Sequence, residues 1–296
     1  MAGQKISFLN RIRSSFNIFS SYEKGYMGNA QNDIEVHKVL LQCLSEHAKV
    51  DVAEARILDI GCGQLGTQVA LFNADGADVW GVDLEVPTFT MTPAIFLWVC
   101  KSNGLERAIK SLIRHILFDK AYIKNLKRLY NKTVAFNSLY LRIQSATSLS
   151  FPDAMFDFIY SSYVFEHIDD VPKAVNEVNR VLKNNGIARV LIHLFPSLSG
   201  GHNLEWQFPD ISKARKAMPW DHLLENKFPA NAFLNKLRLH DYREIFNEYM
   251  KIKEEIIITK GTSHLTLELE AKLKKKGFSR EDMISEQAIF ICGKKK

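Results

Sequence analysis

The sequence predicts an α/β domain organised around a doubly wound, mainly parallel β-sheet. Short apolar runs of strand length alternate with segments of helical periodicity over most of the chain, which is the pattern of βαβ units. One of these runs leads into a glycine-rich turn and then a helical segment, as in sheets that bind a ligand at their carboxyl edge. The 296 residues suffice for one large domain with insertions. We expect an N-terminal helical segment over 1–50 and the main domain over 51–296.

The first elements follow from hydrophobic periodicity and from residues that begin or end helices. Residues 33–48 have apolar positions on one helical face, and Asp33 is the expected N-cap. Two short apolar strands come next, and each ends in an acid, Asp59 and Asp83. In order, the expected elements are a helix over 33–48, a strand over 56–59, a helix that follows the glycine turn and ends at Ala74, and a strand over 79–83.

A long helical insertion, over 85–135, is expected between the second strand and the third. Between Lys101 and Lys132 the insertion holds nine basic residues and two acids, Glu106 and Asp119. This excess of basic over acidic residues is larger than the net charge of +6 of the whole chain. Three interpretations stay open: a solvated charged face over a buried apolar one, a lid that attracts an anionic substrate, and contact with an anionic membrane surface through 101–132. Nucleic acid is not an expected partner, because no stacking aromatics are interleaved with the basic residues.

The second half of the chain continues the alternation and contains one long irregular segment. Asp170 and Pro172 begin a helix that is expected to end near Leu182, where a turn over 184–186 follows. Residues 195–230 are rich in Pro, Gly, Trp and His, and long loops of this kind usually carry function. The other expected elements are strands over 139–144, 156–160 and 188–194, helices over 231–237 and 241–250, a strand over 252–260, a helix over 265–276 and a strand over 288–292.

Composition excludes several classes of protein. The longest apolar run, 94–100, is about half as long as a membrane span requires. The four cysteines lie far apart without a C-x-x-C pair, so the sequence predicts neither a disulfide framework nor a zinc site, and no metal site is expected. A reducing compartment, the cytoplasm, is the expected location. The oligomeric state stays open.

The glycine turn is the segment most informative about function. Gly61, Gly63 and Gly66 have G-x-G-x-x-G spacing, which permits a sharp turn and close approach of a ligand at a helix N-terminus. Dinucleotide-binding enzymes share this spacing. However, Asp59 would repel a pyrophosphate at this position and attract an ammonium or sulfonium group, and S-adenosylmethionine carries both. Asp83, 22 residues after Gly61, suits a carboxylate that accepts hydrogen bonds from a ribose.

Four segments together resemble the class I S-adenosylmethionine-dependent methyltransferases with a type-11-like domain. They are ILDIGCGQLG, VWGVDLE, QSATSLSFPDAMFDFIYSSYVFEHI and VNRVLKNNGIARVLI, in the family's order over about residues 50–195. The resemblance implies a Rossmann-like, seven-stranded sheet whose last strand, 288–292, runs antiparallel, and S-adenosyl-L-methionine as the cofactor. The residues placed at the cofactor are Asp59, Gly61, Cys62, Gly63, Gly66, Asp83, Leu84, Ser145, Ala146, Thr147 and Ser161.

The chain departs from the family pattern in two places. The family usually has an acid just before Ala146, where this chain has Ser145, so the Ser145 hydroxyl and the Ala146 backbone are left to contact adenine. The insertion after Asp83 is also longer than the common pattern. The segments SLSGGHNLEW and PWDHL resemble a subgroup of methyltransferases from bacterial surface-glycan and secondary-metabolite pathways, which implies a sugar-containing or other small acceptor.

Methyl transfer to a hydroxyl requires alignment of the acceptor, exclusion of water and removal of a proton. The region 195–250 is expected to form the acceptor side of the site. His202, on a glycine-flanked loop, is the first candidate for the base; Asp221 and His222 form the second, and His167 the third. His193 lies within an apolar strand and is expected to be a hydrogen-bonded core residue.

The sequence therefore predicts an enzyme that transfers a methyl group from S-adenosylmethionine to a hydroxyl of a small molecule or glycan-type substrate. Three alternatives remain. One is an N-methyltransferase that acts on a small molecule, and another is a nicotinamide-dependent oxidoreductase on a related sheet. The third is a non-catalytic module that only binds S-adenosylmethionine, which the missing acid at Ser145 keeps open.

Overall fold

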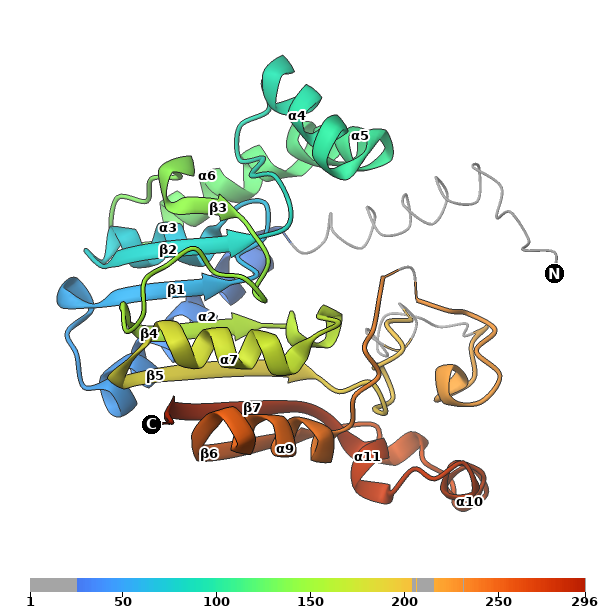
Figure 1. The fold of residues 1–296 in the computed structure, drawn as a ribbon. Coiled ribbons are helices and arrows are strands. Elements are labelled where there is room, and N and C mark those ends of the chain that lie inside the picture. Colours follow the sequence, from blue (N-terminus) through green and yellow to red (C-terminus); the bar gives the residue numbers. More distant parts are fainter. Residues whose placement is uncertain (1–25, 204–205, 207–215, 231, 296) are drawn as a thin grey trace.

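The centre of the molecule is a single seven-stranded sheet with helices on both faces (Figure 1). The structure is a computed structural model that describes residues 26–203, 206, 216–230 and 232–295. The strand order is β3-β2-β1-β4-β5-β7-β6, and only β7 runs against its neighbours. This confirms the predicted fold. The strands are β1 (Arg56–Ile60), β2 (Asp78–Asp83), β3 (Leu141–Ile143), β4 (Phe156–Ser162), β5 (Leu182–His193), β6 (Met250–Thr259) and β7 (Ser285–Lys294).

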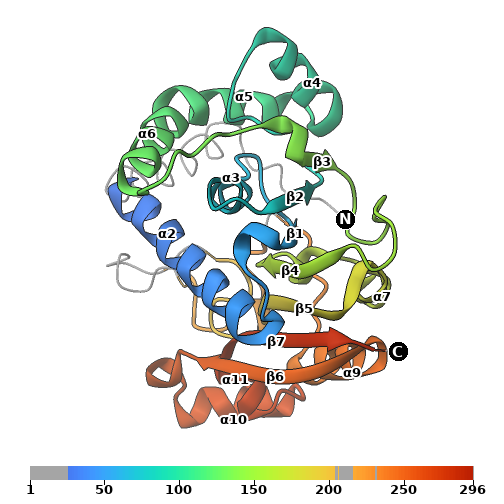
Figure 2. The ribbon, with the colours of Figure 1, turned by 90° about the vertical axis from the view of Figure 1, so that its left-hand side faces the viewer.

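Two helical layers cover the sheet, one on each face (Figure 2). Helices α2 (Tyr26–Cys43) and α3 (Thr67–Ala74) pack on one face, and α7 (Val171–Val181) and α9 (Leu239–Tyr249) pack on the other. The central strands β1 and β4 are therefore buried on both sides, which explains why they are almost continuously apolar rather than alternating. The parallel strands β1 to β4 all end at one edge of the sheet, where the predicted site residues meet.

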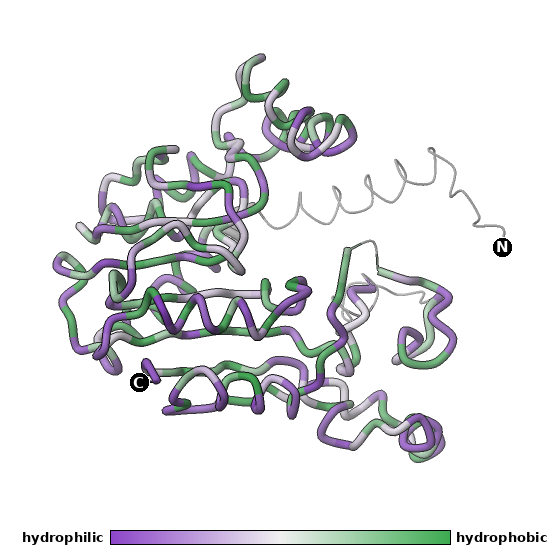
Figure 3. The backbone as a smooth tube through the Cα atoms, viewed as in Figure 1, coloured by the Kyte–Doolittle hydropathy of each residue, from purple (hydrophilic) through white to green (hydrophobic). Residues whose placement is uncertain are grey.

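The insertion forms three helices, which lie away from the later strands β6 and β7 (Figure 2). They are α4 (Pro93–Asn103), α5 (Leu105–Arg114) and α6 (Lys120–Leu129). A π-helical turn, η3 (His115–Asp119), lies between α5 and α6. Helix α6 packs on α2 through Tyr122 and Leu126. Helices α4 and α5 and the turn η3 instead leave apolar residues in solvent, and Figure 3 shows hydrophobic segments along the tube of α4 and α5. Seven residues of these three elements are between 39% and 67% exposed: Leu97, Trp98, Leu105, Ile109, Ile113, Ile116 and Leu117.

This exposure corrects the first interpretation of the insertion. A solvated charged face over a buried apolar one is wrong for α5, because Leu105, Ile109 and Ile113 follow one another at four-residue intervals on its exposed side. Among the described residues, none of the helices has the length and apolar character needed to cross a membrane.

Three further elements differ from the prediction. The helix expected over 33–48 begins earlier, at Tyr26, and its last turn is a π-helix, η1 (Leu44–Ala48). The turn expected over 184–186 lies inside β5, where the pairing shifts from Phe156 opposite Leu182 to Phe158 opposite Ile187. The structure also contains α10 (Leu267–Lys275), close to the expected helix, and a short α11 (Arg280–Ile284) that the sequence did not predict.

The helix expected over 231–237 is wrong for its described part. Residues 232–238 are irregular, because Asn235 holds them against the turn η5 (Phe165–His167) after β4. The Asn235 side-chain amide donates to the carbonyls of Phe165 (2.7 Å) and Ile168 (3.0 Å). Its backbone amide donates to the Glu166 carbonyl at 3.0 Å. These three bonds give donors to the carbonyl groups of η5 and Ile168, and the segment around Asn235 forms no helix of its own.

Candidate cofactor and acceptor site

The glycine turn has the backbone geometry that its sequence predicts. Gly61, Gly63 and Gly66 have φ values of +81°, +66° and +60°, a region that side chains make costly. A Cβ on Gly61 would lie 2.0 Å from Val164 Cγ2, whereas one on Gly63 would meet nothing within 4 Å. Gly66 is the N-cap of α3. The open space at Gly63 and the free N–H groups at the start of α3 leave room for a ligand.

Asp83 connects the glycine turn to the end of β2. Its Oδ2 accepts a hydrogen bond from the Gly63 amide at 2.8 Å, and its Oδ1 accepts one from the Glu85 amide at 2.9 Å. Each carboxylate oxygen has a second lone pair that these bonds leave free. The next residue, Leu84, is 65% exposed, so its side chain lies beside this edge without being part of the core.

Asp59 is a buried carboxyl at the end of β1, only 5% exposed. Burial raises its pKa to about 7; the hydroxyl of neighbouring Tyr160 acts in the opposite direction, and the negative charge of Asp83 adds to the increase. The pKa of the Cys62 thiol is raised by burial and by the same two carboxyl groups. Cys62 is therefore a thiol rather than a nucleophilic thiolate, in agreement with a packing role.

The segment after β3 lies beside Asp83, because the Gln144 amide donates to the Asp83 carbonyl at 3.0 Å. Ser145 forms a turn there: its Oγ lies 2.8 Å from Thr147 Oγ1 and accepts from the Thr147 amide at 3.2 Å. Ala146 packs against the core. The predicted segment 145–147 is thus at the same sheet edge as Asp83, with the Ser145 hydroxyl already bonded to its neighbour.

Ser161 lies at this edge but points into the sheet. Its side chain is fully buried, and Oγ donates to the Ile60 carbonyl at 2.8 Å. This bond joins the end of β4 to the end of β1. The whole residue is buried, so Ser161 exposes neither its side chain nor its backbone to a ligand.

The insertion covers the glycine turn from one side. The buried side chain of Gln64 and the hydroxyl of Ser111 on α5 exchange hydrogen bonds of 3.2 and 3.3 Å. The Thr88 amide also donates to the Gln64 carbonyl at 2.8 Å. Helix α5, which carries the exposed apolar row, is therefore joined by these hydrogen bonds to the glycine turn of the expected cofactor site.

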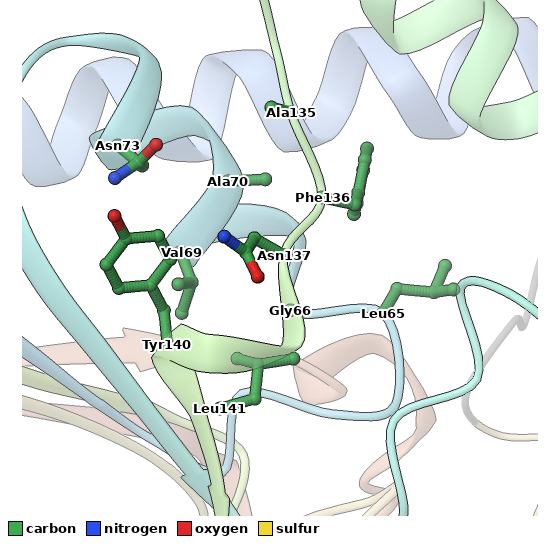
Figure 4. Close-up of a pocket in the computed structure, with 10 residues that line it drawn as sticks. All are labelled: Leu65, Gly66, Val69, Ala70, Asn73, Ala135, Phe136, Asn137, Tyr140 and Leu141. Carbon is green, nitrogen blue, oxygen red and sulfur yellow. The ribbon is translucent and has the colours of Figure 1, made fainter. Parts of the chain in front are cut away.

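A small cavity lies behind the glycine turn, between α3 and the segment that leads into β3 (Figure 4). It is lined by Gly66, Val69, Asn73, Phe136, Asn137 and Leu141, among others. None of the predicted acids lines it. It therefore belongs to the α3 side of the sheet and is not the expected ligand site.

Histidines gather at the ends of β4 and β5. The ring centroids of His202 and His167 are 5.0 Å apart, and those of His202 and His193 are 5.1 Å apart. Because β4 and β5 are neighbours, residues that follow them in the sequence come together at the same edge as the glycine turn. Val164, which fills the space beside Gly61, precedes His167 by three residues.

His202 has the properties of an unprotonated base. Its Nε2 is buried and has no hydrogen-bond partner among the described residues. Burial and, to a smaller extent, the nearby imidazoles of His193, His167 and His222 together lower its pKa to about 4. His202 is thus neutral at pH 7, with a nitrogen lone pair available. Glu205, a titratable residue three positions after His202 that we expect to pair with it, lies outside the described residues.

Asp221 and His222 brace the loop that carries His202. His222 Nε2 lies 2.9 Å from the Phe195 carbonyl, and burial lowers the pKa of His222 to about 4, so that the neutral ring donates there. A Cβ on Gly201 would lie 2.4 Å from His222 Cγ. Asp221 Oδ2 accepts from the Phe228 amide at 3.1 Å. Both side chains are occupied by loop contacts, which favours His202 over this pair.

His193 is the hydrogen-bonded core histidine that the sequence predicts. Its Nε2 lies 2.7 Å from Ser199 Oγ, which in turn donates to Glu286. The three groups are buried together. His193 thus forms the inner wall of the histidine cluster.

Glu166 is a site residue that sequence reasoning missed. It is 2% exposed, and neither carboxylate oxygen has a hydrogen-bond partner among the described residues. Burial raises its pKa to about 8. Its adjacency to His167 was visible, but its burial depends on Asn235, 69 residues away, and no local pattern indicates that contact.

Comparisons with known proteins agree with this geometry. A family described as "Methyltransferase domain" matches residues 104–190. An uncharacterised methyltransferase, YcgJ of Bacillus subtilis (strain 168), is 48% identical over 52 residues. The two matches support a class I S-adenosylmethionine-dependent methyltransferase. The matched segment covers 18% of this chain and 21% of YcgJ, so the match spans about one fifth of the curated relative.

Several solved structures resemble this chain in their fold. The crystal structure of YcgJ is 19% identical, with a TM-score of 0.41, and the likeness covers 86% of this chain and 99% of that one. A geranyl diphosphate C-methyltransferase from Streptomyces coelicolor A3(2) is 13% identical, with a TM-score of 0.47, over 93% of this chain and 84% of that one. Neither likeness bears on the acceptor of this methyltransferase.

Proposed function

We propose that the methyltransferase transfers a methyl group from S-adenosylmethionine to a hydroxyl of a small metabolite, with a sugar-containing acceptor as the first choice. The observation that carries this proposal is the unpartnered, neutral His202 at the same sheet edge as the glycine turn. A hydroxyl needs a proton acceptor close to the methyl group, whereas the cofactor already activates the methyl group itself. We also propose a cytoplasmic location, which the four free cysteines support.

The residues of the first half fit the cofactor by shape and charge. The open space at Gly63 and the start of α3 suit its carboxylate end. The buried Asp59 suits a cation, because an adjacent positive charge would restore its ionised form. Asp83 and the segment 145–147 suit the ribose and adenine. When bound, S-adenosylmethionine supplies an electrophilic methyl group on its sulfonium.

On the acceptor side, the chain excludes water and receives a proton. His202 Nε2 takes the proton of the acceptor hydroxyl, while His222 and Gly201 hold the loop in place. The buried cluster of His193, Ser199 and Glu286 closes the site from within. We therefore expect that loss of the His202 side chain lowers kcat and leaves the affinity for the cofactor nearly unchanged.

The test is methyl transfer to a panel of nucleotide sugars and other hydroxyl-bearing metabolites, followed by mass spectrometry and by S-adenosylhomocysteine release. We expect products heavier by one methylene with hydroxyl acceptors. His202→Ala should lower kcat by roughly 10²-fold or more and leave the Kd for S-adenosylhomocysteine, measured by calorimetry, unchanged. His240→Ala, at an exposed position of α9, is the matched control. Methylation of amines alone, or full turnover by His202→Ala, would contradict the assignment.

We further propose that the insertion attaches the methyltransferase to an anionic membrane surface. The seven exposed apolar side chains of α4, α5 and η3 lie beside the exposed lysines Lys101, Lys110, Lys120 and Lys124. An apolar row flanked by cations is the arrangement that inserts at a lipid interface with anionic headgroups. Such contact would bring the enzyme to acceptors carried on lipid.

Vesicle sedimentation tests this attachment. The enzyme should bind phosphatidylglycerol vesicles at least about 10-fold more tightly than phosphatidylcholine vesicles, and the double variant Ile109→Asp, Ile113→Asp should lose binding. Lys275→Asp, on α10, is a charge control outside the insertion. Equal binding by the double variant would overturn the proposal. A wild-type dimer that the double variant converts to a monomer would assign the apolar row to a second copy instead.

A further inference from the structure

Three metal-ligand side chains meet at the ends of β4 and β5. Glu166 and His167 belong to η5, which follows β4, and His202 lies on the loop that follows β5. One ligand atom of each lies within 4.8 Å of the others. The two segments are 35 residues apart in the sequence, which is why no ligand spacing indicated a metal site.

The Glu166 carboxyl has no cationic partner among the described residues. It is 2% exposed, neither oxygen has a partner at hydrogen-bond geometry, and the nearby backbone amides of Glu166 and His193 offset its burial only in part. Burying a carboxylate without a cation or donors is costly. A bound cation would remove this cost, and the structure places no lysine or arginine there among the described residues.

The two imidazoles are oriented as ligands. His167 Nδ1 lies 2.8 Å from the Phe233 carbonyl, so the neutral ring donates Nδ1–H there and keeps a lone pair on Nε2. Metal-binding histidines commonly fix the ring in this way, through a hydrogen bond from the other nitrogen. His202 Nε2 is buried without a partner among the described residues. Each ring therefore offers one unprotonated nitrogen.

From this geometry we infer that Glu166, His167 and His202 bind one divalent transition-metal ion of the zinc type. Two imidazole nitrogens and one carboxylate oxygen form the donor set of a catalytic zinc site that keeps an open coordination position. The soft thiolate donors that would favour other metals are absent from this cluster within the described residues.

The use of this ion in the reaction rests on the proposed function, whereas its binding does not. An acceptor hydroxyl in the open position would lose its proton more readily, because a bound divalent ion lowers the pKa of a coordinated oxygen. With the ion present, His202 would be a metal ligand and would not take the proton itself, and the proton of the coordinated hydroxyl would pass to bulk water as the methyl group is transferred.

Titration of the EDTA-treated enzyme with Zn²⁺ and Co²⁺ tests the site. We expect one ion per chain by calorimetry and a Co²⁺ absorption spectrum of low coordination number. Glu166→Gln, which keeps the side-chain shape, should weaken binding by at least about 10-fold, and His202→Ala should abolish the Co²⁺ spectrum. His240→Ala is the control for surface histidines. Circular dichroism and S-adenosylhomocysteine binding verify that each variant is folded.

Two outcomes would overturn the inference: no stoichiometric binding by the wild type, or binding by Glu166→Gln and His202→Ala equal to that of His240→Ala. The proposed function fails separately. If Zn²⁺ binds but no hydroxyl acceptor is methylated, the metal site stands and the function does not. If methyl transfer proceeds unchanged after EDTA treatment and without stoichiometric metal binding, the function stands and the metal site does not.

Discussion

At the end of β1, the Asp59 carboxyl occupies a place that opposes its ionisation. Burial raises its pKa to about 7, whereas the same carboxyl in an unfolded chain titrates at about 4. Between these two values the folded protein holds a proton that the unfolded chain has released. The free energy of unfolding therefore falls as pH rises through this window. At neutral pH the raised pKa of Asp59 therefore lowers the free energy of unfolding of the cofactor-free enzyme.

Asp59→Asn removes the titration and should stabilise the cofactor-free enzyme. Relative to wild type, the variant should gain free energy of unfolding as pH rises from about 4 to about 7, reach roughly 2 to 4 kcal/mol, and then stay level. Urea unfolding at several pH values measures this difference. Glu54→Gln, at an exposed acid, is the control. A constant difference across the window would contradict the assignment.

Single residues were predicted well where local geometry alone decides their role. Gly61, Gly63 and Gly66 adopt the positive φ values that their spacing predicts. Asp83 lies at the end of β2 as expected, yet its bonds to the Gly63 and Glu85 amides depend on the folded loop. Glu166 could not be found, because its burial comes from a segment distant in the sequence.

Among the elements, the segment 232–238 shows how tertiary contacts override local periodicity. Its apolar residues predict a helix, but Asn235 gives its hydrogen bonds to η5. A helix there would remove the Asn235 donor from the Phe165 and Ile168 carbonyls. The exposed row on α5 is a second case, because periodicity predicts an amphipathic helix but not the side that faces the protein.

Asn235→Ala tests the importance of this contact. Loss of the side-chain amide leaves two carbonyls without that donor, and we expect a loss of about 2 kcal/mol in the free energy of unfolding. Hydrogen exchange should accelerate over 165–168, while the amides of β1 keep their protection. Asn247→Ala, at an exposed position of α9, should change neither quantity by comparison. Unchanged exchange over 165–168 would show that η5 is held by other contacts.

For the molecule as a whole, alternation of strands and helices was sufficient to predict the architecture. The seven strands and the antiparallel β7 came from the resemblance to a family and are confirmed. The path of the insertion could not be predicted, since α6 packs on α2 while α4 and α5 extend into solvent. The packing of α6 on α2 depends on contacts between residues distant in the sequence, such as Tyr122 and Asp33, which are 89 residues apart.

The position of β7 predicts a strong effect of C-terminal truncation. Strand β7 lies between β5 and β6, and β6 pairs with no other strand in the described sheet. A chain that ends at Ile284 should therefore lose cooperative thermal unfolding, because two strands and the cover of α9 are detached together. Removal of residues 295 and 296 alone should lower Tm by only a few degrees. A cooperative transition in the longer truncation would contradict this role of β7.

The contact between Gly61 and Val164 has a consequence for how the two halves of the enzyme communicate. One methyl group of Val164 occupies the volume that a side chain on Gly61 would need, and the same short turn continues into Glu166 and His167. In the proposed function, Val164 therefore lies between the expected cofactor site and the expected acceptor site. We expect the binding of one ligand to shift Val164 and so to change the affinity for the other.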